Sequence, residues 1–377
     1  MIKIAVMLRH LKEVGGIKVY TVNLLKNLLR LDQVNEYFFL YKDEDPLGSY
    51  HQYSNVRERV VKAPSKFLWD QVAVPRIARK ENVDIIFNPK LSIPLFAAQK
   101  TVFPLHGLEQ FAVPEAYPCW DRWYTRLMMP LFCRSTDAIV SMTYKGAKEM
   151  ERYLKIKSEK VHVIPEAYDL RFRVLPSSEV ERVRQKYHLP QKFILFVGGL
   201  FPVKNFGNLL RSFQQVQSKF PDHYLVAVGF QRWKFKDDLA LIKKLNLESR
   251  VILPGYIPDE DLPSFYNRAQ AFVFPSLYEG FGIPILEAMA CGCPVITTRT
   301  GCSPEVAGDA AFLINPKNPQ EIALAIEKVL IDSTLRQNLI QAGLKRAADF
   351  RWEKTARLTL ALFEKMAGVK NKLPQVK

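Results

Sequence analysis

The 377-residue sequence has no apolar run of the roughly 18 residues that a membrane-spanning helix needs. Residues 1–8 are apolar, but the stretch is short and the basic pair Arg9-His10 follows it directly. A basic leader and a small-residue cleavage site are also lacking, so we interpret this segment as a first strand rather than a signal peptide. The sequence therefore favours a cytoplasmic protein, long enough for two domains.

Cysteine is scarce, and the common nucleotide-binding signatures are missing. The five cysteines are odd in number and lack a paired C-x-x-C, which argues against a disulfide framework or a zinc site and favours buried thiols. No G-x-G-x-x-G is followed by a ribose-binding acid, which disfavours a Rossmann oxidoreductase. The G-x-x-x-x-G-K-[ST] of a P-loop is absent as well.

Acidic residues are too few to balance the basic ones, which leaves a net charge of +16. The excess is spread along the chain, without an arginine-rich block or a nucleic-acid-binding motif, so we expect no nucleic-acid partner. A small anionic ligand or an anionic membrane surface fits this charge better. Charge alone does not decide between the two.

The sequence does contain short apolar, β-branched runs that alternate with helical patterns, which predicts parallel sheets with crossover helices. Helices are expected at 17–31, at 67–80 with a kink or division at Pro75, and at 144–154. The predicted strands are 2–8, 36–41, 83–88, 101–105, 137–142 and 161–164 in the first half, and 193–197, 224–228, 251–253, 271–275, 293–297 and 311–314 in the second.

The pattern breaks near residues 165–190 and then restarts, which predicts an α/β protein of two Rossmann-like domains with parallel sheets facing a central cleft. We place the domains at 1–170 and 171–350, followed by a C-terminal helix and a basic, frayed tail within 351–377. Ligands of such sheets bind at the carboxyl ends of the strands, so the loops after strands are the candidate sites.

Two of these loops are glycine-rich and precede helices. Gly15-Gly16 lies before the helix at 17–31, where backbone amides could approach a phosphate, although a plain turn explains two glycines equally well. The second loop, Gly198-Gly199 through Lys204 to Asn205, follows the strand at 193–197. Lys204 is either a phosphate-binding charge near a helix N-terminus or a solvated surface lysine.

The third loop is the most specific. It follows the strand at 271–275, contains Glu279, and leads into a helix whose first position suits Pro284. The amides of Gly282 and Ile283 would then form an anion site. Glu287 lies one turn inside this helix, so the two glutamates can address opposite ends of one ligand through its hydroxyls. The alternative for Glu287 is an acid that is merely favoured by the helix dipole.

Other candidate features are weaker. The D-x-D matches at 43–45 and 259–261 are interpreted as a polar turn and a capped helix start, so no metal site is expected. His106 ends a strand and either faces the cleft or is satisfied in the domain interior. Residues 116–134 mix tryptophan, tyrosine and arginine, which suits a membrane-interface helix or a helix packed partly in the domain.

Together these motifs resemble the retaining GT-B glycosyltransferases of family four, over nearly the whole chain and most strongly at 193–315. The most specific element is E-x7-E, from Glu279 to Glu287. The segments 293–296 (CPVI) and 304–308 (PEVAG) also resemble the family. The first half, with Trp69-Asp70-Gln71 and Pro114-Glu115, resembles mannosyltransferases of polysaccharide assembly.

The resemblance implies roles for individual residues. Gly15 and Gly16 would shape the acceptor-side loop, Lys204 would meet the diphosphate, and Glu287 would bind the ribose. Glu279, with the amides of Phe281 and Gly282, would hold the donor sugar, and the Ile283 amide would help to bind the phosphate. The loop 255–257 would border the base. His106 would lie near the transferred sugar, and the helix near 352–366 would return to the first domain. The implied catalytic residues are His106, Lys204 and Glu279, and the implied donor-binding residues are Gly15, Gly16, Gly198, Gly199, Asn205, Tyr256, Ile257, Gly280, Phe281, Gly282, Ile283 and Glu287.

The chain departs from the family at three positions. Gly199 stands where arginine is frequent, Gly107 follows His106 where aspartate is common, and Glu166 stands where asparagine is common. These departures concern the diphosphate site and the identity of the donor more than the fold.

The expected function is a retaining, metal-independent hexosyltransferase of polysaccharide, lipopolysaccharide or glycolipid assembly, acting by front-face displacement. Its donor would be a GDP- or UDP-linked sugar, its acceptor a saccharide or a lipid-linked saccharide, and it would need no cofactor. An anionic membrane surface is a further candidate partner, which would place the protein on the inner face of the plasma membrane. The alternative is a sugar-nucleotide-binding subunit without turnover.

Overall fold

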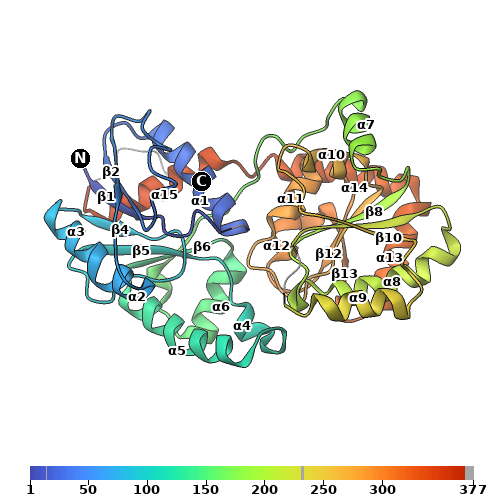
Figure 1. Ribbon diagram of the computed structural model, residues 1–377, viewed down its shortest axis with the longest axis horizontal. Coiled ribbons are helices and arrows are strands. Elements are labelled where there is room, and N and C mark those ends of the chain that lie inside the picture. Colours follow the sequence, from blue (N-terminus) through green and yellow to red (C-terminus); the bar gives the residue numbers. More distant parts are fainter. Residues whose placement is uncertain (14, 231–232, 370–377) are drawn as a thin grey trace. The chain divides into compact units, whose positions relative to one another are not determined.

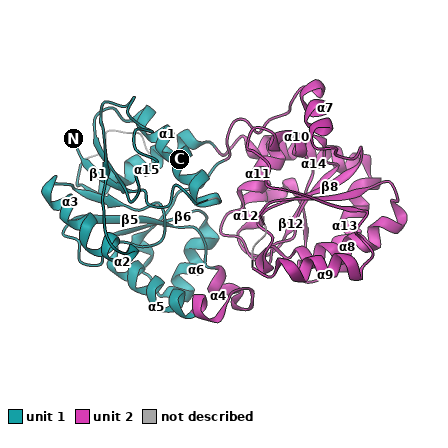
Figure 2. Ribbon diagram, viewed as in Figure 1, with its two compact units in different colours: residues 1–108, 123–167, 351–377 teal, residues 109–122, 168–350 magenta. Residues whose placement is uncertain are grey.

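The computed structural model describes residues 1–13, 15–230 and 233–369, which form two compact units (Figures 1 and 2). Unit 1 comprises residues 1–108, 123–167 and those from 351 on, and unit 2 comprises 109–122 and 168–350. The sequence placed the boundary after residue 170 and assigned 109–122 to the first domain, whereas in the structure this short segment groups with unit 2. Residues 370–377 of the expected basic tail lie outside the described residues.

Unit 1 contains a parallel sheet in the order β3-β2-β1-β4-β5-β6-β7. The six strands predicted in this half are confirmed, with ends that move by one or two residues. β3 was missed because its sequence, VRERV, is charged, which is typical of an edge strand and not of an apolar run. The strands are β1 (Lys3–Met7), β2 (Glu36–Tyr41), β3 (Val56–Val60), β4 (Ile85–Phe87), β5 (Lys100–Leu105), β6 (Ala138–Ser141) and β7 (Val161–Val163).

The last helix of the chain, α15 (Trp352–Met366), packs against α1 (Gly16–Leu31), so its expected return to the first domain is confirmed. Trp352 meets Tyr20 of α1 edge-on, with ring centroids 5.8 Å apart. The helical stretch at 66–80 is divided as predicted, because a π-helical turn precedes Pro75. The other helical segments of unit 1 are α2 (Lys66–Leu68), η1 (Trp69–Ala73), α3 (Val74–Lys80), α6 (Tyr144–Leu154) and η3 (Ser158–Lys160), and α5 (Cys119–Ser135) begins in the segment assigned to unit 2.

Unit 2 contains the second parallel sheet, in the order β10-β9-β8-β11-β12-β13, which is the Rossmann order 3-2-1-4-5-6. All six predicted strands are confirmed: β8 (Phe193–Val197), β9 (Tyr224–Val228), β10 (Val251–Gly255), β11 (Ala271–Phe274), β12 (Val295–Thr298) and β13 (Ala311–Ile314). The helical segments are α4 (Glu109–Ala112), η2 (Pro114–Ala116), α7 (Ser177–Lys186), η4 (Pro202–Lys204), α8 (Phe206–Lys219), α9 (Phe235–Lys244), α10 (Leu262–Arg268), α11 (Ile283–Ala290), α12 (Ser303–Ala307), η5 (Gly308–Ala310), α13 (Pro319–Ile331) and α14 (Ser333–Ala347).

The strand order decides which loops are neighbours. β8 pairs with β9 on one side and with β11 on the other. The chain runs outward from β8 through β9 to β10 and then crosses back to β11, from which it runs in the opposite direction across the sheet. At such a switch point the loops that follow β8 and β11 lie side by side at the carboxyl edge of the sheet. In unit 1 the loops after β1 and β4 are related in the same way.

Candidate active site

The loops after β8 and β11 are joined by an ion pair between Lys204 and Glu279, two of the residues singled out in the sequence. Lys204 Nζ lies 2.6 Å from Glu279 Oε1, and the two side chains are 17% and 10% exposed. The ammonium group also lies 5.2 Å from the centre of the Phe274 ring. Lys204 is therefore held by a carboxylate and an aromatic face, and it is not a solvated surface lysine.

Asn205 fastens these two loops together at the backbone level. Its side-chain amide donates to the carbonyl oxygens of Pro275, at 2.9 Å, and Pro316, at 2.6 Å. Its backbone lies in the left-handed region with φ 60°, a conformation that asparagine tolerates better than most residues. These two hydrogen bonds fix the backbone at Asn205, and they thereby position the preceding residue, Lys204.

The loop after β12 holds the backbone of Glu279. Cys302 N–H donates to the Glu279 carbonyl at 3.1 Å, and Thr300 Oγ1 donates to the carbonyl of Leu277 at 3.1 Å. Gly301, with φ 59°, lies so close that a Cβ there would come 2.9 Å from Glu279 N. A glycine is needed at position 301 for two reasons: its positive φ is unfavourable for residues with a side chain, and the contact with Glu279 leaves no room for a Cβ.

The loop after β11 ends at Gly282, whose φ of 99° turns the chain into α11. Pro284 is the second residue of this helix and not the first, a position where an N–H also lacks an intrahelical partner. Within the described residues, the N–H groups of Phe281, Gly282 and Ile283 donate to no acceptor. Together with the helix N-terminus they form a candidate anion site.

Glu287 is the fifth residue of α11 and is buried. Its Oε2 accepts a hydrogen bond from Tyr266 of α10 at 2.9 Å. Burial raises the pKa of this carboxyl to about 8, and the hydrogen bond from Tyr266 opposes the shift only in part. At neutral pH the group is therefore mainly protonated and can donate as well as accept a hydrogen bond.

Exposed aromatic rings follow the neighbouring strands. Tyr256, after β10, stacks on Phe230, after β9, with ring centroids 4.7 Å apart and planes 21° apart. Both rings are at least one-third exposed, while Ile257 is buried. At Gly229 a Cβ would lie 1.9 Å from the Gly198 carbonyl oxygen, so the loops after β8 and β9 touch through their backbones.

The remaining predicted residues, Gly15, Gly16 and His106, belong to unit 1. Gly15 is the N-cap of α1, which begins at Gly16. His106 follows β5, and both of its ring nitrogens have protein partners: Nδ1 lies 2.9 Å from Glu166 Oε1, and Nε2 lies 2.9 Å from the carbonyl oxygen of Pro89.

The two D-x-D segments are occupied by basic partners. Asp43 and Asp45 lie 3.7 and 2.6 Å from Lys12 Nζ. Asp261 is at the N-cap position of α10 as expected, but its carboxylate does not cap the helix and binds Lys186 of α7 at 2.6 Å. Among the described residues no group of three or more His, Cys, Asp or Glu side chains could hold a metal ion. All five cysteines are free thiols.

Three positions of this arrangement were missed in the sequence. Phe230 and Thr300 follow strands and could have been found by the rule used for the other loops. Tyr266 could not, because it is recognised only through Glu287, a partner distant in the chain. Glu166 was noted in the sequence as a departure from the family, but its pairing with His106 was not predicted.

Comparisons with known proteins match both units. The family model described as Glycosyltransferase Family 4 matches residues 14–172, and the model described as Glycosyl transferases group 1 matches residues 178–346. The O-antigen chain mannosyltransferase B of Escherichia coli is 30% identical over 292 residues, which are 76% of this chain and 76% of that protein. The serotype-specific mannosyltransferase WbdA of Escherichia coli is 31% identical over 275 residues, 71% of this chain but only 34% of its own length.

Solved structures resemble the whole fold. Sucrose-phosphate synthase from Thermosynechococcus elongatus matches with a TM-score of 0.78 and 20% identity, over 98% of this chain and 100% of that one. HepE from Anabaena, in complex with UDP and glucose, matches with a TM-score of 0.79 and 18% identity, over 97% and 100%. At these identities the likeness concerns the fold alone.

The raised pKa of Glu287 predicts how stability depends on pH. A carboxyl whose pKa is about 8 when folded and 4.5 as a free side chain stabilises the native state below pH 4.5, and this contribution is lost as the pH rises to about 8. Glu287→Gln cannot ionise, so the parent should lose stability relative to this variant by on the order of 1.4 kcal/mol per pH unit in this window. Urea titrations at pH 5 and pH 8 measure the difference in free energy of unfolding between variant and parent, with the exposed Glu248→Gln as control. A difference that is the same at both pH values would contradict a neutral Glu287.

Proposed function

The chain belongs to the group 1 glycosyltransferases of family four and has their fold of two Rossmann-like domains, and on this premise we propose that it transfers a hexose, with retention of configuration, from a nucleoside-diphosphate sugar to a saccharide or lipid-linked acceptor. The observation that carries the proposal is the convergence of Lys204, Glu279 and the free amides before α11 at the carboxyl edge of one sheet. These groups supply what a diphosphate-linked sugar needs, namely positive charge for phosphate oxygens and acceptors for hydroxyl groups.

Each group has a distinct part in the proposed donor site. Lys204 and the amides of Gly282 and Ile283 bind the diphosphate and stabilise the charge that grows on it as the bond to the sugar breaks. Glu279 accepts hydrogen bonds from the sugar. Glu287, protonated at neutral pH, both donates to and accepts from the ribose hydroxyls. The stacked rings of Phe230 and Tyr256 border the base.

The ion pair between Lys204 and Glu279 describes the site before a donor binds. A diphosphate carries more negative charge than one carboxylate, so its oxygens compete with Glu279 for the Lys204 ammonium group. Glu279 is then released to accept hydroxyl groups of the sugar. Until the ligand binds, each partner of the pair neutralises the charge of the other in a site that is mostly removed from water.

Retention follows from the direction of attack. In a front-face displacement the acceptor hydroxyl approaches on the side that the diphosphate leaves, and a phosphate oxygen takes its proton. The protein then contributes orientation and charge stabilisation, not a covalent intermediate. Lys204 and the helix N-terminus can stabilise a diphosphate directly, so we propose that transfer is independent of metal ions.

The relatives suggest the sugar and the setting. The two relatives reported above are named as an O-antigen chain mannosyltransferase and a serotype-specific mannosyltransferase. We therefore take mannose as the first candidate hexose, polysaccharide assembly as the setting, and the GDP- and UDP-linked sugars as candidate donors.

A donor panel tests the proposed function. The purified chain, offered GDP- and UDP-linked hexoses with a saccharide acceptor, should release nucleoside diphosphate from one donor class, and the released amount should be unchanged by EDTA. Activity that is lost with EDTA and restored by Mg²⁺ or Mn²⁺ would contradict metal independence. Binding of a donor without any product would instead support the sugar-nucleotide-binding alternative.

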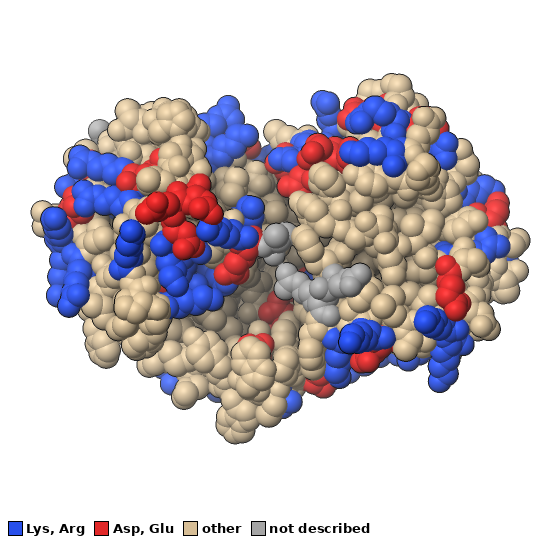
Figure 3. Space-filling view, in the orientation of Figure 1, with Lys and Arg blue, Asp and Glu red and all other residues tan. Residues whose placement is uncertain are grey.

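An apolar stripe on α5 supports the membrane as a partner. Trp120, Trp123, Tyr124, Leu127 and Leu131 are all exposed and recur at the spacing of one helix face, while Thr125, Met129 and Phe132 are buried on the other. The helix also contains three arginines against one acid, Asp121. Charged side chains are sparse over this part of unit 1 in Figure 3. Exposed tryptophan and tyrosine beside arginine suit the interface of an anionic bilayer.

No helix in the described part of the chain is long and apolar enough to cross a membrane. From the exposed stripe we propose that α5 lies on the surface of an anionic membrane and brings the enzyme to a lipid-linked acceptor. The basic excess of the chain, +16, favours the same surface.

Vesicle flotation tests this docking surface. The parent should float with vesicles that contain anionic phospholipid, less so at higher salt. The double variant Trp123→Ser/Leu127→Ser should bind at least about tenfold more weakly, because each buried apolar side chain contributes about 1.5–3 kcal/mol. The control Leu324→Ser/Ile331→Ser alters two equally exposed residues of α13 and should float like the parent. Parent-like flotation of the α5 variant would remove this helix as the membrane contact.

A further inference from the structure

His106 is held on both sides of its ring by groups of unit 1. Its Nδ1 lies 2.9 Å from Glu166 Oε1, and its Nε2 lies 2.9 Å from the carbonyl oxygen of Pro89. The side chains of His106 and Glu166 are 19% and 7% exposed, so little water competes for either bond.

The partners decide where the protons are. A carbonyl oxygen only accepts, so Nε2 must carry a proton, and an ionised carboxylate also only accepts, so Nδ1 must carry one too. A free imidazole is a stronger base than a glutamate carboxylate by about two pKa units, which favours the proton on the ring in such a pair. With a proton on both nitrogens, the ring would be a positively charged imidazolium.

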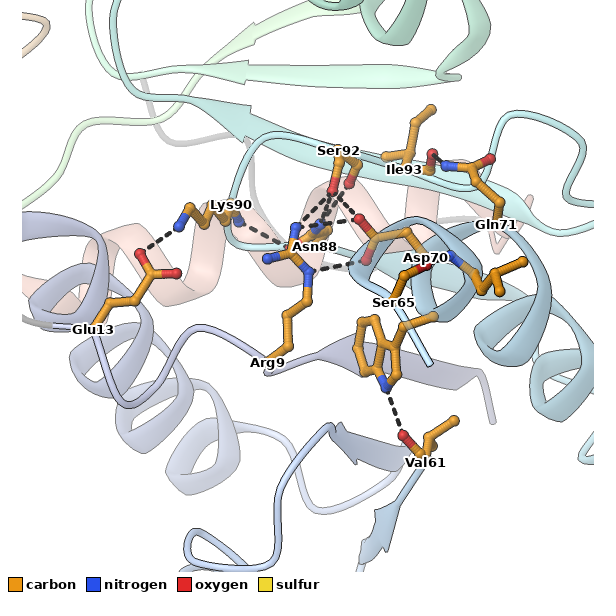
Figure 4. Close-up of polar contacts among 12 residues, drawn as sticks. Arg9, Glu13, Val61, Ser65, Asp70, Gln71, Asn88, Lys90, Ser92 and Ile93 are labelled. Atoms are coloured by element: carbon orange, nitrogen blue, oxygen red, sulfur yellow. Dashed lines mark hydrogen bonds and ion pairs between the residues drawn. The ribbon is translucent and has the colours of Figure 1, made fainter. Parts of the chain in front are cut away.

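The Pro89 carbonyl is not free to turn away, because a buried polar network holds its loop (Figure 4). Asn88 Nδ2 donates to the carbonyl of Ser92, and Lys90 N–H donates to Asn88 Oδ1 at 3.1 Å. Ser92 Oγ donates in turn to Asp70 Oδ2 at 2.9 Å. The turn that presents Pro89 is thereby tied to the π-helical segment η1.

Arg9, from the loop after β1, completes the network. Its Nε lies 2.9 Å and its Nη2 3.2 Å from the two carboxylate oxygens of Asp70. Both side chains are at most 10% exposed. Asp70 belongs to the Trp69-Asp70-Gln71 motif. Through Ser92 it fixes the loop after β4. This loop carries the Pro89 carbonyl, which faces Nε2 of His106.

The other ionisable groups near the ring do not replace Glu166. Tyr20 of α1 meets the ring edge-on at 4.8 Å, and burial raises the pKa of its hydroxyl, so it stays neutral. His10, after β1, is also neutral, because burial lowers its pKa to about 4. Lys90 is paired with Glu13. The carboxylate of Glu166 lies at hydrogen-bond distance from Nδ1 and supplies a negative charge there.

We propose that Glu166 is a positioning residue that holds His106 as a doubly protonated imidazolium, with the Pro89 carbonyl accepting the second ring proton. A ring in this state cannot act as a base toward an acceptor hydroxyl. It offers a fixed positive charge instead, which agrees with a displacement in which the donor phosphate takes the proton. This consequence for catalysis rests on the proposed function, whereas the protonation state does not.

Nuclear magnetic resonance of ¹⁵N-histidine-labelled protein tests the protonation state without any need for turnover. His106, identified among the six histidines by its loss in His106→Asn, should show two protonated ring nitrogens at pH 6 and at pH 8. In Glu166→Gln the new amide can donate to Nδ1, so the neutral ring is accommodated and the resonance should titrate near the ordinary histidine value of about 6.5. A neutral parent ring at pH 8 would overturn the proposal.

The pH profile of transfer is the second readout. An imidazole with the ordinary pKa is about 75% protonated at pH 6 and about 3% at pH 8, so transfer by Glu166→Gln should fall about 25-fold between these values while the parent changes little. Glu166→Asp keeps the charge and should follow the parent. Glu81→Gln, which removes a carboxylate paired with Arg59 elsewhere in unit 1, is the control and should also follow the parent.

The two readouts separate the possible failures. Absence of transfer with every donor would contradict the proposed function and leave the resonance result valid. Parallel pH profiles of Glu166→Gln and the parent would contradict a role for the imidazolium in transfer. If Glu166→Gln does not fold, as judged by circular dichroism, the titration of His106 in the parent and in Glu166→Asp still decides the protonation state.

Discussion

The ion pair between Lys204 and Glu279 is the contact on which the candidate donor site depends. It joins the loops after β8 and β11, and both partners are mostly removed from water. A charge in such a place is costly without its partner, so each residue restricts where the other can lie. Asn205, Gly301 and Cys302 support the pair through the backbone on either side. These contacts hold both side chains in place, and in the proposed donor complex a diphosphate would replace the Glu279 carboxylate at Lys204.

The parallel sheets explain why these residues meet although they are 75 positions apart. The order 3-2-1-4-5-6 makes β8 and β11 neighbours at the point where the chain reverses direction across the sheet. In unit 1, the loops after β1 and β4 are neighbours at the corresponding point, where Arg9, Asp70 and Ser92 form their network. The same topological position is thus built differently in the two units. Unit 2 has a lysine–glutamate pair and backbone amides that donate to no acceptor among the described residues, and unit 1 has a buried polar network.

Most of the fold could be predicted because buried parallel strands are continuous apolar runs, as in residues 193–197 and 271–274. β3 was not predicted, because an edge strand with charged residues at its centre lacks a continuous apolar run. The loops with Lys204, Glu279 and Glu287 were found because they follow strands and precede helices. The protonation of Glu287 and the pairing of His106 with Glu166 could not be found in this way. Both result from burial and from partners distant in sequence, which local patterns do not record.

The central claim, that Lys204 passes from Glu279 to the donor diphosphate, is tested most directly by calorimetric titration with the nucleoside diphosphate of the active donor, alongside transfer rates. Lys204→Ala should weaken diphosphate binding and lower transfer by about 10²–10³, the usual effect of removing one preorganised donor of charge stabilisation. Glu279→Gln should bind the diphosphate at least as well as the parent and lose transfer. Lys219→Ala, which breaks an exposed ion pair with Glu327, should change neither quantity. Near-normal transfer by Lys204→Ala, or equal losses of diphosphate affinity in the Lys204 and Glu279 variants, would contradict the account.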